Sequence, residues 1–227
     1  MGRAIFDDRL SAGRDLAARL SAYRGRSDVV VIALPRGGVP VAAEVADALS
    51  APLDLLLVRK LGAPGQPELA MGAIAAGGGR VLNPEVVATL GVTQREIERV
   101  AAQEQRELER RERVYRVGRA PLALAGRCVI LVDDGVATGA TVRAAIDVIR
   151  AQQPSRLVLA VPVAAPETVR TLAASSDEVV CLAQPEPFVA IGLWYRCFDQ
   201  VGDEEVIRLL ERARARRPDG PQRAPPP

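Results

Sequence analysis

The residues from Val129 to Thr141 read VILVDDGVATGAT, in which an apolar run leads into two carboxylates and a loop of glycine and threonine. Gly135 and Gly139 allow the backbone to turn, so that successive amides point into one concavity. The N-terminus of a following helix adds the positive end of its dipole, and this environment binds a phosphate monoester. Asp133 and Asp134 can accept hydrogen bonds from a vicinal diol. A phosphate and a diol on one sugar describe a ribose 5-phosphate.

Other interpretations of this stretch fit it less well. It contains no Gly-Lys-Ser/Thr, so it is not a Walker loop, and no G-x-G-x-x-G for a dinucleotide. An ordinary strand-to-helix turn with a glycine and an acidic N-cap remains as the alternative. The length of the stretch and its order of strand, loop and helix favour the phosphate loop.

The stretch resembles the phosphoribosyl-diphosphate (PRPP) binding signature of type I phosphoribosyltransferases. The resemblance implies that Asp133 and Asp134 fix the ribose and favour a developing positive charge on its ring. It also implies that the loop after them binds the 5′-phosphate through Gly135, Val136, Ala137, Thr138, Gly139, Ala140 and Thr141. The similar region spans roughly residues 29–200.

Two shorter segments agree with this family in the expected order. Pro35-Arg36-Gly37-Gly38 resembles the family's pyrophosphate loop, which implies that Arg36, Gly37 and Gly38 hold the diphosphate. Val58-Arg59-Lys60 resembles a basic segment of the adenine and orotate enzymes, which adds Lys60 to the same group. Lys60 is the only lysine of the chain. The catalytic residues implied are therefore Lys60, Arg36, Asp133 and Asp134.

The acceptor is indicated by the segment from Pro185 to Gly192, which is similar to the C-terminal hood of the hypoxanthine-guanine enzymes. In that pattern Phe188 stacks on the base and the Val189 backbone reads the base edge. Alternatively, Phe188 packs with the other aromatic residues against the last strand. Ala137 stands where the hypoxanthine-guanine enzymes carry their proposed general base, an aspartate. A purine is favoured, and the identity of the base stays open.

The chain has no histidine, which excludes Ser-His-Asp and Cys-His catalysis and any histidine-containing metal site. A metal is therefore expected to be a hard ion with oxygen ligands, Mg²⁺, held mainly through PRPP, with Asp133 and Asp134 as candidate ligands from the protein. Cys128, Cys181 and Cys197 have no metal-like spacing and are expected to be reduced.

Continuous apolar runs separated by helical patterns indicate a parallel sheet that is covered on both faces. The predicted strands are 29–34, 53–58, 128–132, 157–163 and 178–182, and the predicted helices are 7–23, 40–49, 139–152, 166–174 and 203–216. The fold class is α/β, with an open, mostly parallel twisted sheet flanked by helices, as in type I phosphoribosyltransferases. We expect one such domain over residues 1–216, with a small hood at 183–200 and a disordered, proline-rich tail at 217–227.

Residues 61–118 are predicted to form a helical lid or arm inserted into this domain. Glycine and proline are frequent in 61–83, where a hairpin is possible around 70–76 and 80–82, and a charged helix is predicted over 94–116. Glu107 and Arg111 are one of its pairs at the favourable i,i+4 spacing. Its apolar stripe is thin, which fits a solvated helix packed by one edge, a mobile lid, or the arm of a homodimer.

The function implied by the resemblance is transfer of the 5-phosphoribosyl group of PRPP to a nucleobase with release of pyrophosphate. The alternatives are a regulatory protein that binds PRPP or a nucleotide without turnover, and a hydrolase. The formal net charge of +2 argues against nucleic acid as a partner. No apolar run approaches the ~18 residues of a membrane span, and the first residues lack a signal peptide's apolar segment, so a cytoplasmic protein is expected.

Overall fold

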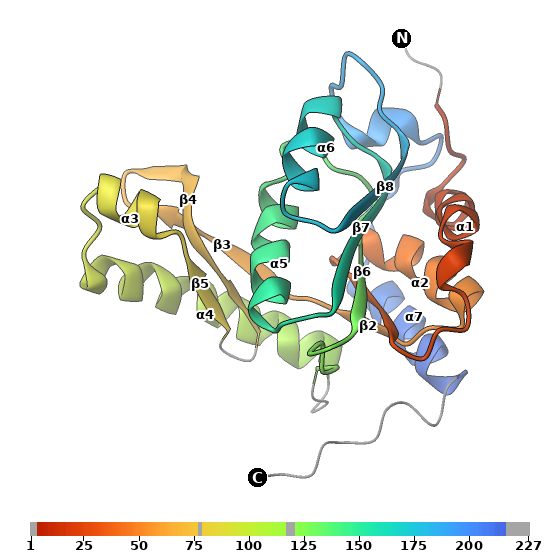
Figure 1. The fold of residues 1–227 in the computed structure, drawn as a ribbon, viewed down its shortest axis with the longest axis horizontal. Helices are drawn as coiled ribbons and strands as arrows, with labels where there is room; N and C mark the ends of the chain where they lie inside the picture. Colours follow the sequence, from red (N-terminus) through yellow and green to blue (C-terminus); the bar gives the residue numbers. More distant parts are fainter. Residues whose placement is uncertain (1–3, 77–78, 117–120, 217–227) are drawn as a thin grey trace.

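The computed structural model describes residues 4–76, 79–116 and 121–216. Its centre is a five-stranded parallel sheet in the order β2-β1-β6-β7-β8, with helices on both faces (Figure 1). The strands are β1 (Val29–Ala33), β2 (Leu53–Leu55), β6 (Cys128–Val132), β7 (Arg156–Val163) and β8 (Glu178–Ala183). The predicted fold class is confirmed.

Two layers of helices cover this sheet. One layer comprises α1 (Arg9–Arg19), α2 (Gly38–Leu49) and α7 (Asp203–Ala215), and the other comprises α5 (Ala140–Ala151) and α6 (Pro166–Ala173) (Figure 1). Val29 and Val31 of β1 belong to the core of the first layer, whereas Val30 and Ile32 belong to that of the second. Both faces of the strands are therefore buried, which is why they read as unbroken apolar runs.

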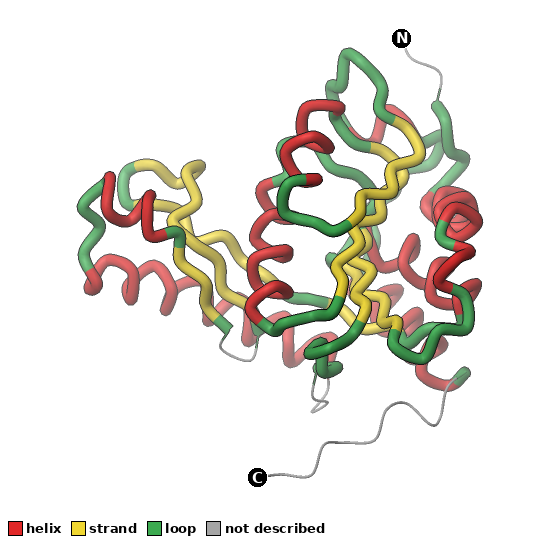
Figure 2. Tube along the Cα trace, viewed as in Figure 1, coloured by secondary structure: helices red, strands yellow, loops and turns green. Residues whose placement is uncertain are grey.

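A second, antiparallel sheet stands beside the first and carries the inserted segment. Its order is β3-β4-β5, and Figure 2 shows it to one side of the main sheet. The segment comprises β3 (Val58–Ala63), β4 (Gln66–Ala75), β5 (Arg80–Leu82), α3 (Pro84–Thr89) and α4 (Gln94–Arg116). Both α4 and α5 contact β3 and β4. The insertion is thus joined to the main domain by a shared core.

The prediction of one strand over 53–58 is wrong, because the apolar run is divided between the two sheets. β2 ends at Leu55, and Val58 begins β3, which pairs with β4 instead of the main sheet. Lys60 consequently lies inside β3, opposite Ala73, and not in a loop after a core strand. β3 contains glycine and an ion-paired arginine, so its sequence lacks the apolar alternation that predicts a strand.

The helices agree closely with the sequence predictions. α4 has the predicted bounds, whereas the predicted helix 7–23 is shorter, because α1 ends at Arg19 and a single 3-10 turn follows at Ser21–Tyr23. Asp8 caps α1 by accepting a hydrogen bond from the Ser11 amide at 2.7 Å. The hood contains a second 3-10 turn, η2 (Ile191–Trp194). The predicted tail 217–227 lies outside the described residues, and no helix within them is long and apolar enough to cross a membrane.

Candidate active site

The predicted phosphate loop connects β6 to α5, with Gly139 at φ +74° directly before the helix. Three hydrogen bonds of the described residues help to hold the loop: the Val136 amide donates to a carbonyl of β7 at 2.9 Å, the Ala165 amide donates to the Val136 carbonyl at 3.1 Å, and Thr168 Oγ1 of α6 donates to the Ala137 carbonyl at 2.6 Å. The amides of Ala137, Thr138 and Gly139 donate to no other residue in the described ranges. Free amides at the N-terminus of a helix form an anion-binding cradle.

The predicted pyrophosphate loop follows β1 and lies against the end of β6. A Cβ atom at Gly38 would stand 2.8 Å from the Val132 carbonyl oxygen, and one at Gly37 would stand 2.0 Å from Asp134 Oδ2. No larger side chain fits at either position without moving the neighbouring backbone or carboxylate. The two glycines therefore allow the two loops to approach each other at the carboxyl ends of adjacent strands.

The amides of this loop differ in what they can bind. The Gly38 amide donates to the Leu34 carbonyl at 3.0 Å and is engaged within the loop. The amides of Arg36 and Gly37 donate to no residue that the structure describes, and the peptide bond between Pro35 and Arg36 is cis. Of the residues predicted to bind pyrophosphate, Arg36 and Gly37 thus present amide donors that are free among the described residues. Gly38 instead allows this loop to lie close to the end of β6.

The two adjacent carboxylates have different surroundings. Asp134 is buried, and its Oδ2 accepts a hydrogen bond from Arg9 Nε at 2.8 Å. Its backbone carbonyl accepts from the Tyr195 hydroxyl at 2.5 Å. Asp133 Oδ1 accepts from the Asp134 amide at 2.9 Å, whereas its Oδ2 has no hydrogen-bond partner among the described residues. Each carboxylate thus has one oxygen without a hydrogen-bond partner among the described residues, and Asp133 is the more exposed of the two.

Burial determines the protonation of this pair. Desolvation raises the pKa of Asp133 well above its usual value, and the neighbouring Asp134 raises it further. Burial also raises the pKa of Asp134, while the Arg9 guanidinium opposes that shift. A ligand that donates hydrogen bonds to Asp133 would favour its ionised form.

Arg9 is a residue of this site that the sequence analysis missed. Its guanidinium lies 3.8 Å from the centroid of the Phe198 ring, and it donates to the Asp199 carbonyl at 2.7 Å. It thereby joins α1, the phosphate loop and the hood. Arg9 and Asp134 are 125 positions apart, and no motif connects them, so nothing in the sequence indicates this ion pair.

The predicted base-binding residues lie in the hood beside the phosphate loop. A Cβ atom at Gly135 would stand 2.6 Å from Ile191 Cγ2, so the hood and this loop are in close contact. The Phe188 ring is half-buried, with its centroid 6.4 Å from that of Trp194, and Val189 is 73% exposed. Packing among the hood aromatics, the alternative considered for Phe188, is therefore present. A role in base binding stays a prediction.

Lys60 lines an open cleft of about 680 Å³ that extends between α4 and the first turn of α5, along the edge of β3. We call this the α4 cleft. Its polar and loop residues include Pro35, Arg59, Lys60, Glu104, Arg111 and Thr141. The structure thus brings Lys60 to the same cleft as the start of the pyrophosphate loop and one threonine of the phosphate loop. Thr138, by contrast, lines a different cavity between α5 and the strands β4 and β5.

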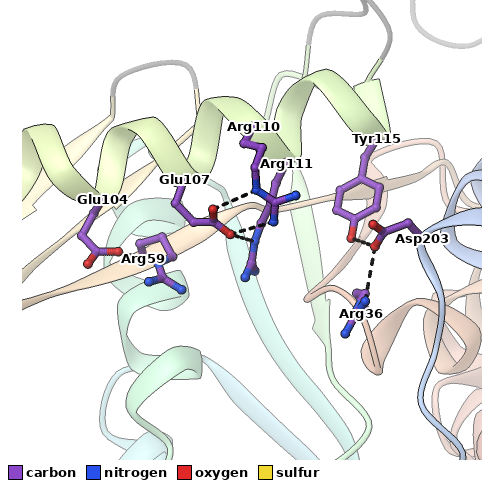
Figure 3. Close-up of polar contacts among 8 residues, drawn as sticks. All are labelled: Arg36, Arg59, Glu104, Glu107, Arg110, Arg111, Tyr115 and Asp203. Carbon is purple, nitrogen blue, oxygen red and sulfur yellow. Dashed lines mark hydrogen bonds and ion pairs between the residues drawn. The ribbon is translucent and has the colours of Figure 1, made fainter.

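The Arg36 side chain forms an ion pair with a residue of α7. Arg36 NH1 lies 3.5 Å from Asp203 Oδ1, and the same oxygen accepts a hydrogen bond from the Tyr115 hydroxyl of α4 at 2.6 Å (Figure 3). Burial and the Asp203 carboxylate raise the pKa of Tyr115 to about 12, so the phenol donates at neutral pH. Asp203 consequently connects the insertion to the pyrophosphate loop.

The described residues contain no group of three or more histidine, cysteine, aspartate or glutamate side chains that could hold a metal ion. Arg9 pairs with Asp134 Oδ2, which leaves one oxygen of each of Asp133 and Asp134 as candidate ligands at the strand ends among the described residues. This donor set fits Mg²⁺ only when a ligand such as a diphosphate supplies most of the oxygens.

Free amides before α5, a glycine loop beside them and a carboxylate with one unpaired oxygen lie at the ends of adjacent parallel strands in the described chain, and these are features of the class of α/β proteins that bind sugar phosphates. Comparison with known proteins agrees with this class, because residues 3–191 match the family described as the phosphoribosyl transferase domain. The chain belongs to this family, and the resemblance seen in the sequence is confirmed.

Individual relatives extend the comparison. Two proteins from strains of Mycobacterium tuberculosis, provisionally named phosphoribosyl transferases, are each 51% identical over 209 residues. That match covers 92% of this chain and 47% of each relative, so the chain spans about half the length of the curated relatives it matches. The crystal structure of the protein TT1426 from Thermus thermophilus has a TM-score of 0.85 and 48% identity, covering 90% of this chain and 97% of that one.

Proposed function

We propose that this protein transfers the 5-phosphoribosyl group of PRPP to a nucleobase, with a purine favoured, and releases pyrophosphate. The observation that carries the proposal is the pairing of two loops at the carboxyl ends of β1 and β6. One presents the free amides of Ala137, Thr138 and Gly139, and the other presents those of Arg36 and Gly37. Two candidate anion-binding loops beside a pair of carboxylates, of which Asp133 is the more exposed, suit a molecule that carries phosphate groups on a ribose.

The roles of the residues follow from the charges that develop in this reaction. Positive charge builds on the ribose ring and negative charge on the departing diphosphate. Asp133 accepts hydrogen bonds from the ribose hydroxyls and favours the positive charge, whereas Asp134 supports the loop through Arg9. Arg36, Gly37 and Lys60 stabilise the diphosphate by electrostatic attraction and hydrogen bonding. Gly38 contributes by allowing the loops to meet.

Two further elements belong to the proposal. Mg²⁺ bound to the diphosphate would neutralise part of its charge and make it a better leaving group. The inserted segment with α4 borders the open cleft, and as a lid over bound PRPP it would exclude water and protect PRPP from hydrolysis. Phe188 and the Val189 backbone are the candidates for contact with the base. The same segment is the proposed arm if the protein forms a homodimer.

A second candidate function is regulation through binding of PRPP or a nucleotide without turnover. It is favoured by Ala137, which leaves the phosphate loop without a carboxylate at the position where the hypoxanthine-guanine enzymes carry their proposed base. Both candidates require the same ligand site, so they differ only in whether a base is phosphoribosylated.

Pyrophosphate release from PRPP and Mg²⁺, measured with a panel of purine and pyrimidine bases, separates the candidates. Base-dependent release, absent in Asp133→Asn, supports transfer. Saturable PRPP binding without release for any base supports the regulatory function instead. Release that needs no base would identify a hydrolase, and no binding of PRPP at all would reject the proposal.

A further inference from the structure

Arg111 of α4 lies beside the start of the pyrophosphate loop and the first turn of α5. It lines the α4 cleft together with Lys60, and it also borders a small cavity lined by Pro35 and Thr141. Pro35 begins the pyrophosphate loop, and Thr141 belongs to the first turn of α5. The sequence pattern presented Arg111 only as one half of a surface ion pair with Glu107.

The helix geometry explains why this arginine faces inward. Leu108, Arg111 and Tyr115 follow one another at spacings of three and four residues, so they share one face of α4. Leu108 is 1% exposed and Tyr115 5% exposed, so this face is turned toward the body of the protein. Figure 3 shows Arg111 extending below α4, on the side where Arg59 and Arg36 are drawn.

Glu107 orients Arg111 by accepting a hydrogen bond from Nε alone. Arg111 Nε donates to Glu107 Oε1 at 2.9 Å, and in the described part of the chain its terminal amino groups have no other partner. Arg110 and Arg111 lower the pKa of Glu107 to about 2, so this carboxylate is ionised at neutral pH. A guanidinium fixed through Nε still has its terminal N–H groups free to bind phosphate oxygens.

The α4 cleft as a whole suits an anion. Arg59, Lys60 and Arg111 are its three cationic lining residues, and Glu104 is its single carboxylate among the described residues. Glu104 is already paired with Arg59 Nε at 2.6 Å. The described lining thus brings three cationic side chains beside the start of the pyrophosphate loop, of which Arg59 pairs with Glu104 and Arg111 pairs through Nε with Glu107 outside the lining.

We propose that Arg111 is a further substrate-binding residue, which the insertion supplies to the diphosphate, and that Glu107 positions it. This inference rests on the proposed function and assigns α4 a direct role in it. The terminal amino groups of Arg111 bind oxygens of the diphosphate while Nε remains on Glu107. The ligand chemistry is thus a diphosphate held between Lys60 and Arg111, with the 5′-phosphate at the amides of the other loop.

The test compares Arg111→Gln with Arg110→Gln by calorimetric titration of the full chain. Arg110 pairs with the same Glu107 at 2.9 Å but is 57% exposed and does not line the cleft, so it is a matched control. The probes are inorganic pyrophosphate and PRPP, each with Mg²⁺, and ribose 5-phosphate, which lacks the diphosphate. We expect Arg111→Gln to weaken binding of the first two on the order of ten- to a hundredfold. Binding of ribose 5-phosphate should not change, and Arg111→Lys should recover part of the loss.

Three outcomes would overturn the inference. Equal pyrophosphate affinities in Arg111→Gln and Arg110→Gln would place Arg111 outside the site. An equal loss of ribose 5-phosphate binding in Arg111→Gln would mean either that Arg111 contacts the 5′-phosphate or that the substitution disturbs the fold. The melting temperatures of both variants distinguish these two explanations. Wild-type protein that binds ribose 5-phosphate but not pyrophosphate would reject a diphosphate site here. If the wild type binds none of the three probes, the proposed function fails together with the inference.

Discussion

Asp133 and Asp134 are neighbouring residues of one type, yet the structure gives them different tasks. Asp134 faces Arg9 and packs on Gly37, whereas Asp133 keeps one oxygen without a partner among the described residues. Successive side chains at the end of a strand point to opposite sides, so both cannot meet a ligand in the same way. The sequence predicted both carboxylates as one feature and could not separate their surroundings, because Arg9 is remote along the chain.

Replacing each carboxylate by its amide should shift stability in opposite directions. Asp133→Asn removes a charge that is costly to bury and keeps an oxygen for the Asp134 amide. We expect its Tm at pH 7 to rise by about 2–4 °C, corresponding to about 1 kcal/mol in a domain of this size. Asp134→Asn leaves Arg9 without its counter-ion, and we expect a loss of about 1–3 kcal/mol. Differential scanning calorimetry measures both.

The pH dependence of the stability difference between Asp133→Asn and the wild type tests whether burial of charge causes that difference. The pKa of Asp133 is higher in the native than in the unfolded state, so the native state binds more protons, and wild-type stability falls as pH rises through this interval. Asp133→Asn lacks this titration. The stability of the variant relative to the wild type should therefore decrease as pH is lowered toward about 4, the pKa of the aspartate in the unfolded state. An advantage that stays constant from about pH 4 to about pH 8 would contradict burial of charge as the cause.

Lys60 provides a second test at the scale of single residues. A compact ammonium and a planar guanidinium are not equivalent beside a diphosphate. We expect Lys60→Ala to lower turnover of PRPP on the order of ten- to a thousandfold, as for the loss of one electrostatic stabiliser, and Lys60→Arg to recover part of this. Steady-state kinetics with PRPP provide the measurement. Wild-type rates in Lys60→Ala would remove this side chain from the proposed mechanism.

At the scale of elements, prediction succeeded where the periodicity was strong. The bounds of α4 were predicted from its charged pattern, and β1, β6, β7 and β8 from their apolar runs. Prediction failed at β3, because a glycine and two adjacent charged residues replace the apolar alternation there. The pairing of β3 with β4 depends on contacts across the hairpin and with α4 and α5. These contacts override local propensity and cannot be read from one segment.

The contact between α4 and α7 gives a test at this scale. Tyr115 donates to Asp203 at 2.6 Å, and Asp203 also lies near Arg36. We expect Tyr115→Phe to lower the free energy of unfolding by about 0.5–1.5 kcal/mol, the value of one such hydrogen bond. A double-mutant cycle with Asp203→Ala, followed by chemical denaturation, should then give a coupling energy of at least about 0.5 kcal/mol. Additive effects would show that the two helices are not coupled through this bond.

At the scale of the whole molecule, the site lies where three separate parts of the chain meet. The main sheet carries both candidate anion-binding loops, the insertion borders the α4 cleft, and α1 with the hood contacts Asp134 through Arg9 and Tyr195. Motifs predicted the loops because each is contiguous in sequence. They could not predict Arg9, Arg111 or Asp203, since these positions acquire a role only when distant segments pack together.

The central claim is that this arrangement binds PRPP. Its most direct test is the melting temperature of the full chain with increasing PRPP and Mg²⁺, measured beside Asp133→Asn. A ligand at one hundred times its dissociation constant stabilises the native state by about 2.7 kcal/mol. For a domain of this size, we therefore expect Tm to rise by roughly 5–10 °C in the wild type. At the same concentration of PRPP, the variant should show a clearly smaller rise. A wild-type Tm that does not change up to millimolar PRPP with Mg²⁺ would contradict the claim.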